Sequence, residues 1–331
     1  MEQGMGSDFK KIDLTSFRPD DAAWGSAVRV VRTLRDRGHP AFLVGGCVRN
    51  ALLGLPSDDY DVATAARPDD VRALFQKTVD VGAKFGVIIV IDGDCQTQVA
   101  TFRLDGAYED KRHPADVSFS DARSDIMRRD FTINGLFMDP FTGEIVDYAG
   151  GMRDIEKGIV RCIGNPRDRF REDALRLLRA VRFAARFSFH IHPDTWDALV
   201  TMHEGIRQIS AERIRDEILK ILTGPHPGRA LDLLETSGLL AIILPEVQAL
   251  RGVPQPGEFH PEGDCMEHVR LALEALENPS PTLVMGTLLH DIGKPATIEH
   301  SDRIRFNHHD VVGEKIAEEV CTRLRLSNSE K

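Results

Sequence analysis

Two glycines and two aspartates near the start of this 331-residue chain have the spacing of a phosphate and metal site. Gly45 and Gly46 follow an apolar run, and their amide groups can approach a triphosphate closely because glycine has no Cβ atom. Arg49 follows one turn into a short helix whose start adds a favourable dipole for phosphate. Asp59 and Asp61 alternate with other residues, so on a strand both carboxylates leave the same face, roughly 6.5 Å apart along the chain. Two such oxygen ligands can share Mg²⁺, which keeps water and nucleotide phosphates in its remaining positions.

These motifs also resemble a known signature. The run LVGGCVRNALLG followed by DDYDVAT is similar to that of the class II nucleotidyltransferases, the bacterial tRNA CCA-adding enzymes and poly(A) polymerases of the polymerase-beta superfamily. A glycine turn before a solvated acidic strand end is the plainer interpretation, but both motifs at this spacing favour the site. The resemblance implies that Asp59 and Asp61 bind the catalytic Mg²⁺, while Gly45, Gly46 and Arg49 bind the nucleotide.

Composition limits the class of protein. With 42% hydrophobic and 28% charged residues, the chain has the composition of a globular protein of two or three domains. No signal peptide and no run of about 18 apolar residues is found, so we expect a cytoplasmic protein without membrane contact. The five cysteines are scattered singly, which argues against disulfides and a thiolate zinc site. A net charge of −10 excludes a general nucleic-acid coat but permits a local basic stretch.

The elements that must position these residues form a small mixed sheet with helices packed on it. Apolar residues at helical spacing predict a helix around 27–34, which ends before Gly38-His39-Pro40. Strands are expected at 41–44, 86–91 and 97–102, and Pro68 opens a helix through Phe75.

The stretch RRDFTINGLF, from Arg128 to Phe137, is the next motif. Its apolar residues predict the buried side of a helix opened by the charged residues, which ordinarily serve as capping groups. The stretch is nearly identical to the family motif that contacts the sugar of the bound nucleotide. This resemblance implies that Arg129 faces the triphosphate and that Asp130 accepts a hydrogen bond from a ribose hydroxyl.

A polar loop from Leu104 to Ser124 precedes that motif. Loops this long are usually functional or disordered. It resembles a family loop that is needed when the enzyme changes nucleotide, and a plain surface loop is the alternative. The matching residues are Tyr108, Asp110, Arg112 and Pro114.

The segment from Pro166 to Phe187 predicts a helix with an apolar side and an arginine side. Few acids accompany the arginines, which favours a binding face over a solvated one. Asp173 and Arg176 are neighbours on this helix, and a carboxylate acceptor beside a guanidinium donor matches cytosine and adenine but mismatches uracil and guanine. The segment resembles the family's EDxxR motif, which implies that this pair selects CTP and ATP and that Arg179 and Arg182 add nucleotide or phosphate contacts.

A further helix is expected at 209–222, with Ser210 as its N-cap. It resembles the family's neck helix. Packing is its default explanation, and we assign it no chemistry.

Histidines and an aspartate in the C-terminal third form a second candidate site. Imidazole and carboxylate groups on neighbouring helices can hold a transition metal, and the set resembles an HD-type phosphohydrolase domain. Buried histidines satisfied by hydrogen bonds are the alternative. No aspartate follows Asp310, although the usual HD pattern ends with one, so we expect the chain to stop before that residue or to lack it. The candidate ligands are His268, His290, Asp291 and His309.

We therefore expect an α+β fold with a small mixed-sheet, polymerase-beta-like head, an all-α neck and body, and a helical HD-like domain. The expected parts are an N-terminal arm at 1–24, the nucleotidyltransferase head at 25–160, the helical neck and body with RNA contacts at 161–252, and a truncated HD-like domain at 253–331. The function implied by the resemblance is template-independent addition of CMP, AMP or both to the tRNA 3′ end, with ATP, CTP and tRNA as partners.

Three residues depart from the family pattern. Asn50 replaces the usual Asp after Arg49 and is expected to loosen the turn. Gln98 stands where an acid is common, which leaves open whether a third carboxylate binds the metal. Gly135 replaces Ala and is interpreted as a packing variant.

Three other functions remain open at this stage. They are a poly(A) polymerase or an enzyme that adds only A or only C, an HD phosphohydrolase with a nucleotide- or RNA-binding front half, and a non-catalytic RNA-binding protein. The sequence leaves the added base and the oligomeric state undetermined.

Overall fold

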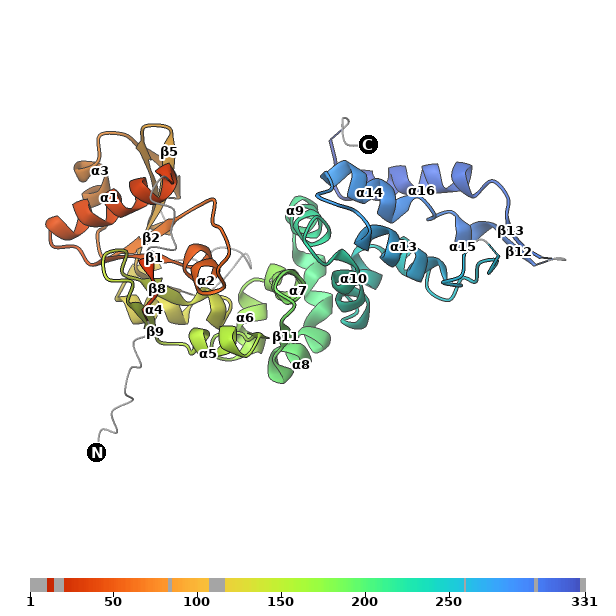
Figure 1. The fold of residues 1–331 in the computed structure, drawn as a ribbon, viewed down its shortest axis with the longest axis horizontal. Coiled ribbons are helices and arrows are strands. Elements are labelled where there is room, and N and C mark those ends of the chain that lie inside the picture. The colour runs from red at the N-terminus through yellow and green to blue at the C-terminus, as the bar shows by residue number, and fades with distance from the viewer. Residues whose placement is uncertain are drawn as a thin grey trace. The chain divides into compact units, whose positions relative to one another are not determined.

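The computed structural model describes residues 11–14, 21–82, 85–106, 117–258, 260–300 and 303–327 (Figure 1). The predicted loop residues Tyr108, Asp110, Arg112 and Pro114 lie outside these ranges. The chain divides into two compact units, Met1–Asn165 and Pro166–Lys331, and each is described by itself. Within the described residues, the structure contains no helix with the length and apolar character that a membrane crossing requires.

A seven-stranded sheet forms the centre of the first unit, which we call the head. Its strand order is β3-β4-β5-β2-β1-β8-β9, and β2 runs parallel to β5 while the other described pairings are antiparallel. The mixed sheet expected from the sequence is therefore confirmed. The strands are β1 (Ala41–Val44), β2 (Asp61–Thr64), β3 (Thr78–Gly82), β4 (Val87–Asp92), β5 (Cys95–Thr101), β8 (Leu136–Met138) and β9 (Ile145–Asp147), with a separate pair β6 (Arg103–Asp105) and β7 (Val117–Phe119), and β10 (Ile159–Val160).

Short helices surround this sheet. They are α1 (Ala22–Asp36), α2 (Gly46–Leu52), α3 (Pro68–Leu74), α4 (Ala122–Met127), the 3₁₀ turn η3 (Thr132–Asn134) and α5 (Gly151–Glu156). Asp21 caps α1 by accepting hydrogen bonds from the backbone amides of Ala23 and Trp24. Phe137 stacks between Phe42 and Phe102, with ring centroids 5.8 and 5.7 Å away, so aromatic packing joins β1, β8 and the residue after β5.

The motif around Arg129 does not open a helix, so that prediction was wrong. Helix α4 ends at Met127, and the chain continues through the turn η3 into strand β8. The apolar residues are buried as predicted, but Phe137 pairs with Val44 in the sheet. A short apolar run does not distinguish a helix from a buried strand, and here the segment is a strand because it pairs with the neighbouring strand β1. Asp130 also accepts a hydrogen bond from the amide of Phe131, a local bond that competes with helix formation.

The second unit is helical. Its elements are α6 (Pro166–Glu172), α7 (Leu175–Arg186), β11 (His190–Ile191), α8 (Pro193–Met202), η4 (His203–Gln208), α9 (Ala211–Leu222), α10 (Pro227–Thr236), α11 (Leu239–Ile243), α12 (Pro245–Gln248), α13 (Cys265–Glu274), α14 (Pro281–Leu289), α15 (Lys294–Thr297), the hairpin β12 (Ile298–His300) and β13 (Ile304–Phe306), and α16 (His309–Arg323). The helical neck, body and HD-like region expected from the sequence are confirmed as a fold class.

The predicted arginine-rich helix is two helices. It breaks at Asp173, whose Oδ1 accepts a hydrogen bond from the amide of Leu175 (3.0 Å) at the start of α7. An aspartate side chain that bonds to a nearby backbone amide favours a helix start over a helix interior. The apolar side of α7 is buried as predicted, with Leu177, Leu178 and Val181 fully covered.

Replacing Gly151 with alanine should destabilise the head. A Cβ atom at this position would lie 2.1 Å from the carbonyl oxygen of Thr132, so α5 would have to move away from η3. Overpacking of this kind costs about 1–3 kcal/mol, measurable by urea unfolding. Gly82→Ala is the control, because its Cβ would meet Val87 at an ordinary 3.5 Å. Equal losses in the two variants would contradict this account.

Candidate functional site

Asp59 and Asp61 flank a buried tyrosine at the start of β2. Asp61 is the first residue of that strand and pairs with Val44, the residue before Gly45, whereas Asp59 precedes the strand that we expected to carry both. The hydroxyl of Tyr60 donates to Asp21 (2.8 Å), and its ring lies edge-on to Trp24. Because Tyr60 turns toward α1, the two flanking carboxylates leave the opposite side of the extended chain.

The two carboxylates repel each other. Burial and the charge of Asp59 raise the pKa of Asp61 to about 6, and Arg129 offsets part of this effect. Burial, together with the charges of Asp61 and Asp59, also raises the pKa of the Cys47 thiol to about 12. The charges of both aspartates therefore reach Cys47 at the start of α2, directly beyond the glycine turn. Paired carboxylates at a glycine turn are a donor set that suits a hard divalent cation.

The glycine turn lies beneath two guanidinium groups. Gly45 has φ +76° and ψ −122°, which glycine adopts far more readily than other residues. A Cβ atom would lie 3.7 Å from Nη1 of Arg129 at Gly45, and 3.7 Å from Nη2 of Arg49 at Gly46. The structure thus brings these four predicted residues together.

Neutral amide side chains fix Arg49. Its Nη1 donates to Oδ1 of Asn134 (2.5 Å), its Nη2 and Nε donate to Oδ1 of Asn50 (2.8 and 3.2 Å), and the residue is only 5% exposed. Asn50 also donates to the carbonyl of Pro56 (2.9 Å), ahead of the two aspartates. We expected Asn50 to loosen this turn, but its side chain is bonded on both sides.

Asn134 extends this network to Asp130. Its Nδ2 donates to Oδ1 of Asp130 (3.0 Å), so one amide holds two predicted nucleotide ligands. Asp130 is 9% exposed. The sequence analysis did not select Asn134 or Asn50 as positioning residues. The run RRDFTIN contains Asn134, but no local pattern pairs it with a residue 85 positions earlier.

A buried carboxylate holds Arg129. Asp125 is 1% exposed and accepts hydrogen bonds from both Arg128 and Arg129, at 2.6 and 2.8 Å for the shorter bonds. Burial alone would raise the pKa of Asp125, but the charges of Arg129 and Arg128 outweigh it and leave the pKa below its usual value. The carboxylate therefore stays ionised and fixes both guanidinium groups.

Gln98 is exposed on β5, and the strand register places it next to Asp61. It lies one residue before Val99, which pairs with Val62 on the neighbouring parallel strand, while Asp61 lies one residue before Val62. The third position that an acid would occupy next to Asp61 therefore carries an amide.

In the second unit, the predicted base-selecting residues have separate side-chain partners. Oδ2 of Asp173 accepts from Nη2 of Arg213 on α9 (2.8 Å), and Nη1 of Arg176 donates to Glu172 (2.6 Å). The backbone amide of Arg176 donates to the carbonyl of Asp173 (3.1 Å), so the two residues are adjacent as expected. Helix α9, to which we assigned no chemistry, therefore fixes the orientation of Asp173.

The other two predicted arginines of α7 contact groups within the same unit. Arg182 forms an ion pair with the buried Glu217 on α9, with Nε 2.9 Å from Oε1. Arg179 lies over the ring of Phe183, 5.2 Å from its centroid.

Three histidines converge on Asp291 in the HD-like region. Their Nε2 atoms lie near its carboxylate oxygens, at 3.2 Å for His290, 3.9 Å for His268 and 3.8 Å for His309. All four side chains line a cavity of about 530 Å³. The structure thus brings the four predicted ligands together, and three imidazoles with one carboxylate form a donor set that suits a transition metal.

A buried lysine completes the surroundings of Asp291. Nζ of Lys294 donates to Oδ2 of Asp291 (2.7 Å) and also to Gln255. Burial would raise the pKa of Asp291, but hydrogen bonds from His290 and Lys294 hold it well below its usual range. Lys294 and Gln255 were missed by the sequence analysis, which interpreted the segment around Gln255 only as a domain boundary.

Comparison with known proteins agrees with this geometry. The mixed sheet, glycine turn and aspartate pair define a nucleotidyltransferase type of head, and residues 41–161 match the family model of the poly(A) polymerase head domain. Residues 188–250 match the model described as the probable RNA and SrmB binding site of polymerase A, and residues 265–330 match the HD domain.

Several individual relatives are CCA-adding enzymes. The CCA-adding enzymes of Geobacillus stearothermophilus and Geobacillus thermodenitrificans are 44% and 45% identical to this chain, over 66% and 70% of its length. The solved Bacillus stearothermophilus CCA-adding enzyme in complex with CTP is 33% identical, with a TM-score of 0.68 over 92% of this chain and 70% of that one. The Thermotoga maritima CCA-adding enzyme complexed with tRNA has the same fold, with a TM-score of 0.64 and 21% identity.

The chain belongs to the nucleotidyltransferase family of the CCA-adding enzymes and poly(A) polymerases, so the predicted resemblance is confirmed. It spans about half the length of the curated relatives that it matches, 54% and 56% for the two Geobacillus proteins.

The titration of Asp61 provides a test of the aspartate pair. In metal-free protein, this carboxyl should titrate near pH 6, measured by NMR of ¹³C-labelled aspartate. Asp59→Asn should lower its pKa because it removes the repelling charge, and Arg129→Met should raise it. Asp58→Asn removes an exposed carboxylate next to Asp59 and should leave the pKa of Asp61 unchanged. If Asp59→Asn had no larger effect than Asp58→Asn, the two side chains would not face each other.

Proposed function

We propose that this protein is a template-independent tRNA nucleotidyltransferase that adds CMP, AMP or both to the tRNA 3′ end. One observation carries the proposal: the repelling pair Asp59 and Asp61 lies beside the Gly45-Gly46 turn, beneath the guanidinium groups of Arg49 and Arg129. The names of the relatives support the substrates, because solved family members are complexes with CTP, ATP and tRNA.

In the proposed reaction, the tRNA 3′-hydroxyl attacks the α-phosphate of the nucleotide and pyrophosphate leaves. Asp59 and Asp61 would hold Mg²⁺, which when bound activates the hydroxyl and neutralises charge on the phosphates. The amides of the glycine turn, Arg49 and Arg129 bind the triphosphate. Asp130 accepts a hydrogen bond from the ribose, a contact that deoxyribose would not offer.

Asp173 and Arg176 act as the template in this proposal. The carboxylate accepts from the exocyclic amine of cytosine or adenine, while the guanidinium donates to the adjacent ring nitrogen. Arg213 and Glu172 keep the two side chains in fixed orientations, which rejection of uracil and guanine requires. A poly(A) polymerase or a single-base enzyme differs only in which nucleotides are incorporated.

A transition-metal centre at His268, His290, Asp291 and His309 is a second proposal, favoured by the convergence of the three Nε2 atoms on one carboxylate. It is also the feature expected of the rival HD phosphohydrolase. That rival predicts phosphatase activity that survives loss of Asp59 and Asp61. A cytoplasmic location likewise remains a prediction.

Removal of either aspartate should abolish nucleotide addition. With end-labelled tRNA lacking CCA, plus CTP and ATP separately and together, Asp59→Ala and Asp61→Ala should lose about a thousandfold in rate, because the bound metal supplies several kcal/mol. Asp58→Ala should retain activity, since its exposed carboxylate neighbours the pair without belonging to it. Full addition by both aspartate variants would refute the transferase proposal, and the single-nucleotide lanes identify the added base.

Loss of Asp173 should relax base choice while incorporation continues. In the same assay, Asp173→Ala should lower discrimination against UTP and GTP about tenfold or more, because an unmatched polar group costs about 1–3 kcal/mol. Arg213→Ala should have a smaller effect in the same direction, since it frees the carboxylate without removing it. Asp168→Ala, which removes an exposed acid of α6 paired with Arg171, is the control. Unchanged selectivity in Asp173→Ala would refute the template role.

A further inference from the structure

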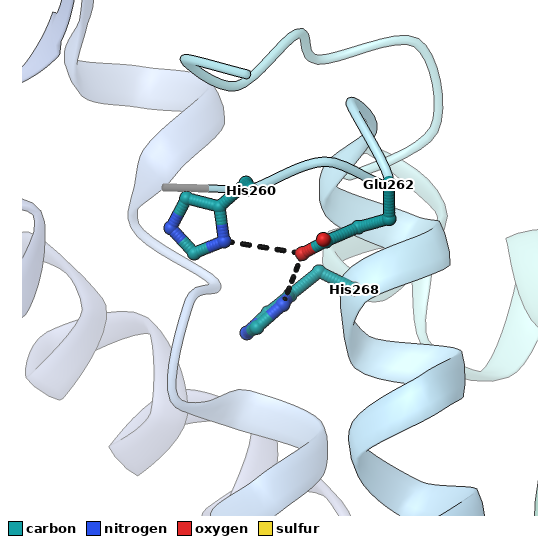
Figure 2. A group of neighbouring side chains, drawn as sticks. All are labelled: His260, Glu262 and His268. Atoms are coloured by element: carbon teal, nitrogen blue, oxygen red, sulfur yellow. Dashed lines mark hydrogen bonds and ion pairs between the residues drawn. The ribbon is translucent and has the colours of Figure 1, made fainter. Parts of the chain in front are cut away.

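A loop before α13 contributes two side chains to the histidine cluster. Two backbone hydrogen bonds close this loop: the amide of Gln255 donates to the carbonyl of Gly263, and the amide of Gly263 donates to that of His260 (both 3.0 Å). Figure 2 shows the result: one carboxylate oxygen of Glu262 bonds to the rings of both His260 and His268. Its Oε1 accepts from Nδ1 of His268 (2.6 Å) and from Nδ1 of His260 (3.1 Å).

These bonds determine where the proton of each imidazole lies. An ionised carboxylate only accepts hydrogen bonds, so Nδ1 of His268 carries the proton and Nε2 has the lone pair. Backbone carbonyls likewise fix the Nδ1 proton of the other two histidines, since Nδ1 of His290 donates to the carbonyl of Thr287 (2.8 Å) and Nδ1 of His309 to that of Phe306 (2.9 Å). All three Nε2 atoms therefore lie next to Asp291, and that of His290 shares its proton with Oδ2 of Asp291 (3.2 Å).

A metal ion bound there would need a lone pair from each Nε2 atom, so the proton on Nε2 of His290 would leave when the ion binds. Lys294 supplies one positive charge, at Oδ2 of Asp291. Once His290 has lost that proton, the three Nε2 atoms and Oδ1 form a set of acceptors, which is the arrangement that a divalent transition metal ion requires.

His260, Glu262 and His268 are also close enough to bind an ion by themselves. His268 cannot supply both ions, because a neutral imidazole has a single lone pair. The hydrogen bond of 2.6 Å between Glu262 and His268 uses the Nδ1 side of the ring, which leaves only Nε2 for a metal.

We propose that Glu262 is a positioning residue that sets the proton position and orientation of His268 for one divalent transition metal ion, and that His260 holds Glu262 in place. The other two histidines are oriented by backbone carbonyls, so Glu262 is the acceptor that mutation can remove. A carboxylate behind the ring also makes the imidazole a stronger ligand. This inference rests on the proposed metal centre but not on the transferase function.

The test is metal titration of the full chain. Asp59→Asn and Asp61→Asn are included in every variant, so that the head carboxylates do not compete. Calorimetry with Co²⁺ and with Ni²⁺ should give one ion per chain. Glu262→Gln and Glu262→Ala should weaken binding about 10- to 100-fold at unchanged stoichiometry, as expected for loss of a carboxylate behind a ligating histidine. The visible spectrum of bound Co²⁺ should change in the same variants.

Two further variants separate positioning from other roles. Glu267→Gln is the matched control, because Glu267 lies on α13 near His268 but pairs with Arg270, and its affinity should equal that of the parent. His260→Gln should weaken metal binding by less than Glu262→Gln. If the Glu262 variants do not fold, it tests the same hydrogen bonds from His260 through Glu262 to His268. Folding is checked by circular dichroism.

Three outcomes would overturn the inference, where the parent is the protein that carries only Asp59→Asn and Asp61→Asn. In the first, both Glu262 variants bind the metal as tightly as the parent does. In the second, the parent binds two ions and Glu262→Gln loses one of them, and in the third, the parent binds no ion. Nucleotide addition, measured with Asp59 and Asp61 restored, should be the same with and without Glu262→Gln. Failure of the metal centre is thereby distinguished from failure of the transferase proposal.

Discussion

The head depends on holding two like charges close together. The negative charges of Asp59 and Asp61 repel each other, and an unfolded chain would let them move apart. Two features prevent this: the β1–β2 pairing, which sets Asp61 opposite Val44, and the hydrogen bond from Tyr60 to Asp21, which anchors the residue between the carboxylates to the start of α1. The central position of β1 and β2 in the sheet supplies the rigidity that such a pair needs.

The two guanidinium groups beside the glycine turn are fixed in two different ways. Neutral amides of Asn50 and Asn134 hold Arg49, whereas the buried carboxylate of Asp125 holds Arg129. In the second unit, an ion pair fixes a proposed template residue, since Arg213 orients Asp173. A side-chain partner from the same unit thus restricts the orientation of each of five proposed nucleotide ligands, namely Arg49, Arg129, Asp130, Asp173 and Arg176.

Local patterns predicted much of the fold. Strand β1, the helices around Arg49 and Pro68, and strands β4 and β5 follow from short apolar runs and from glycine and proline positions. The predicted helix at Arg129 was wrong because pairing with β1, far away in sequence, makes Leu136–Met138 a strand. The four predicted metal ligands of the HD-like region lie together as expected. The residues that support the proposed nucleotide ligands were missed, because the hydrogen bonds from Arg49 to Asn134 and from Arg213 to Asp173 span 85 and 40 positions and leave no periodic signal.

The bonds around Arg49 have a consequence for the energetics of binding. A free arginine side chain carries about 2 kcal/mol of rotamer entropy, which is lost when it is immobilised. Here that loss occurs during folding, when Asn50 and Asn134 confine the guanidinium group. A ligand that meets the already rigid group keeps more of the attraction as net affinity. Such a side chain should also exchange between rotamers slowly whether or not a ligand is present.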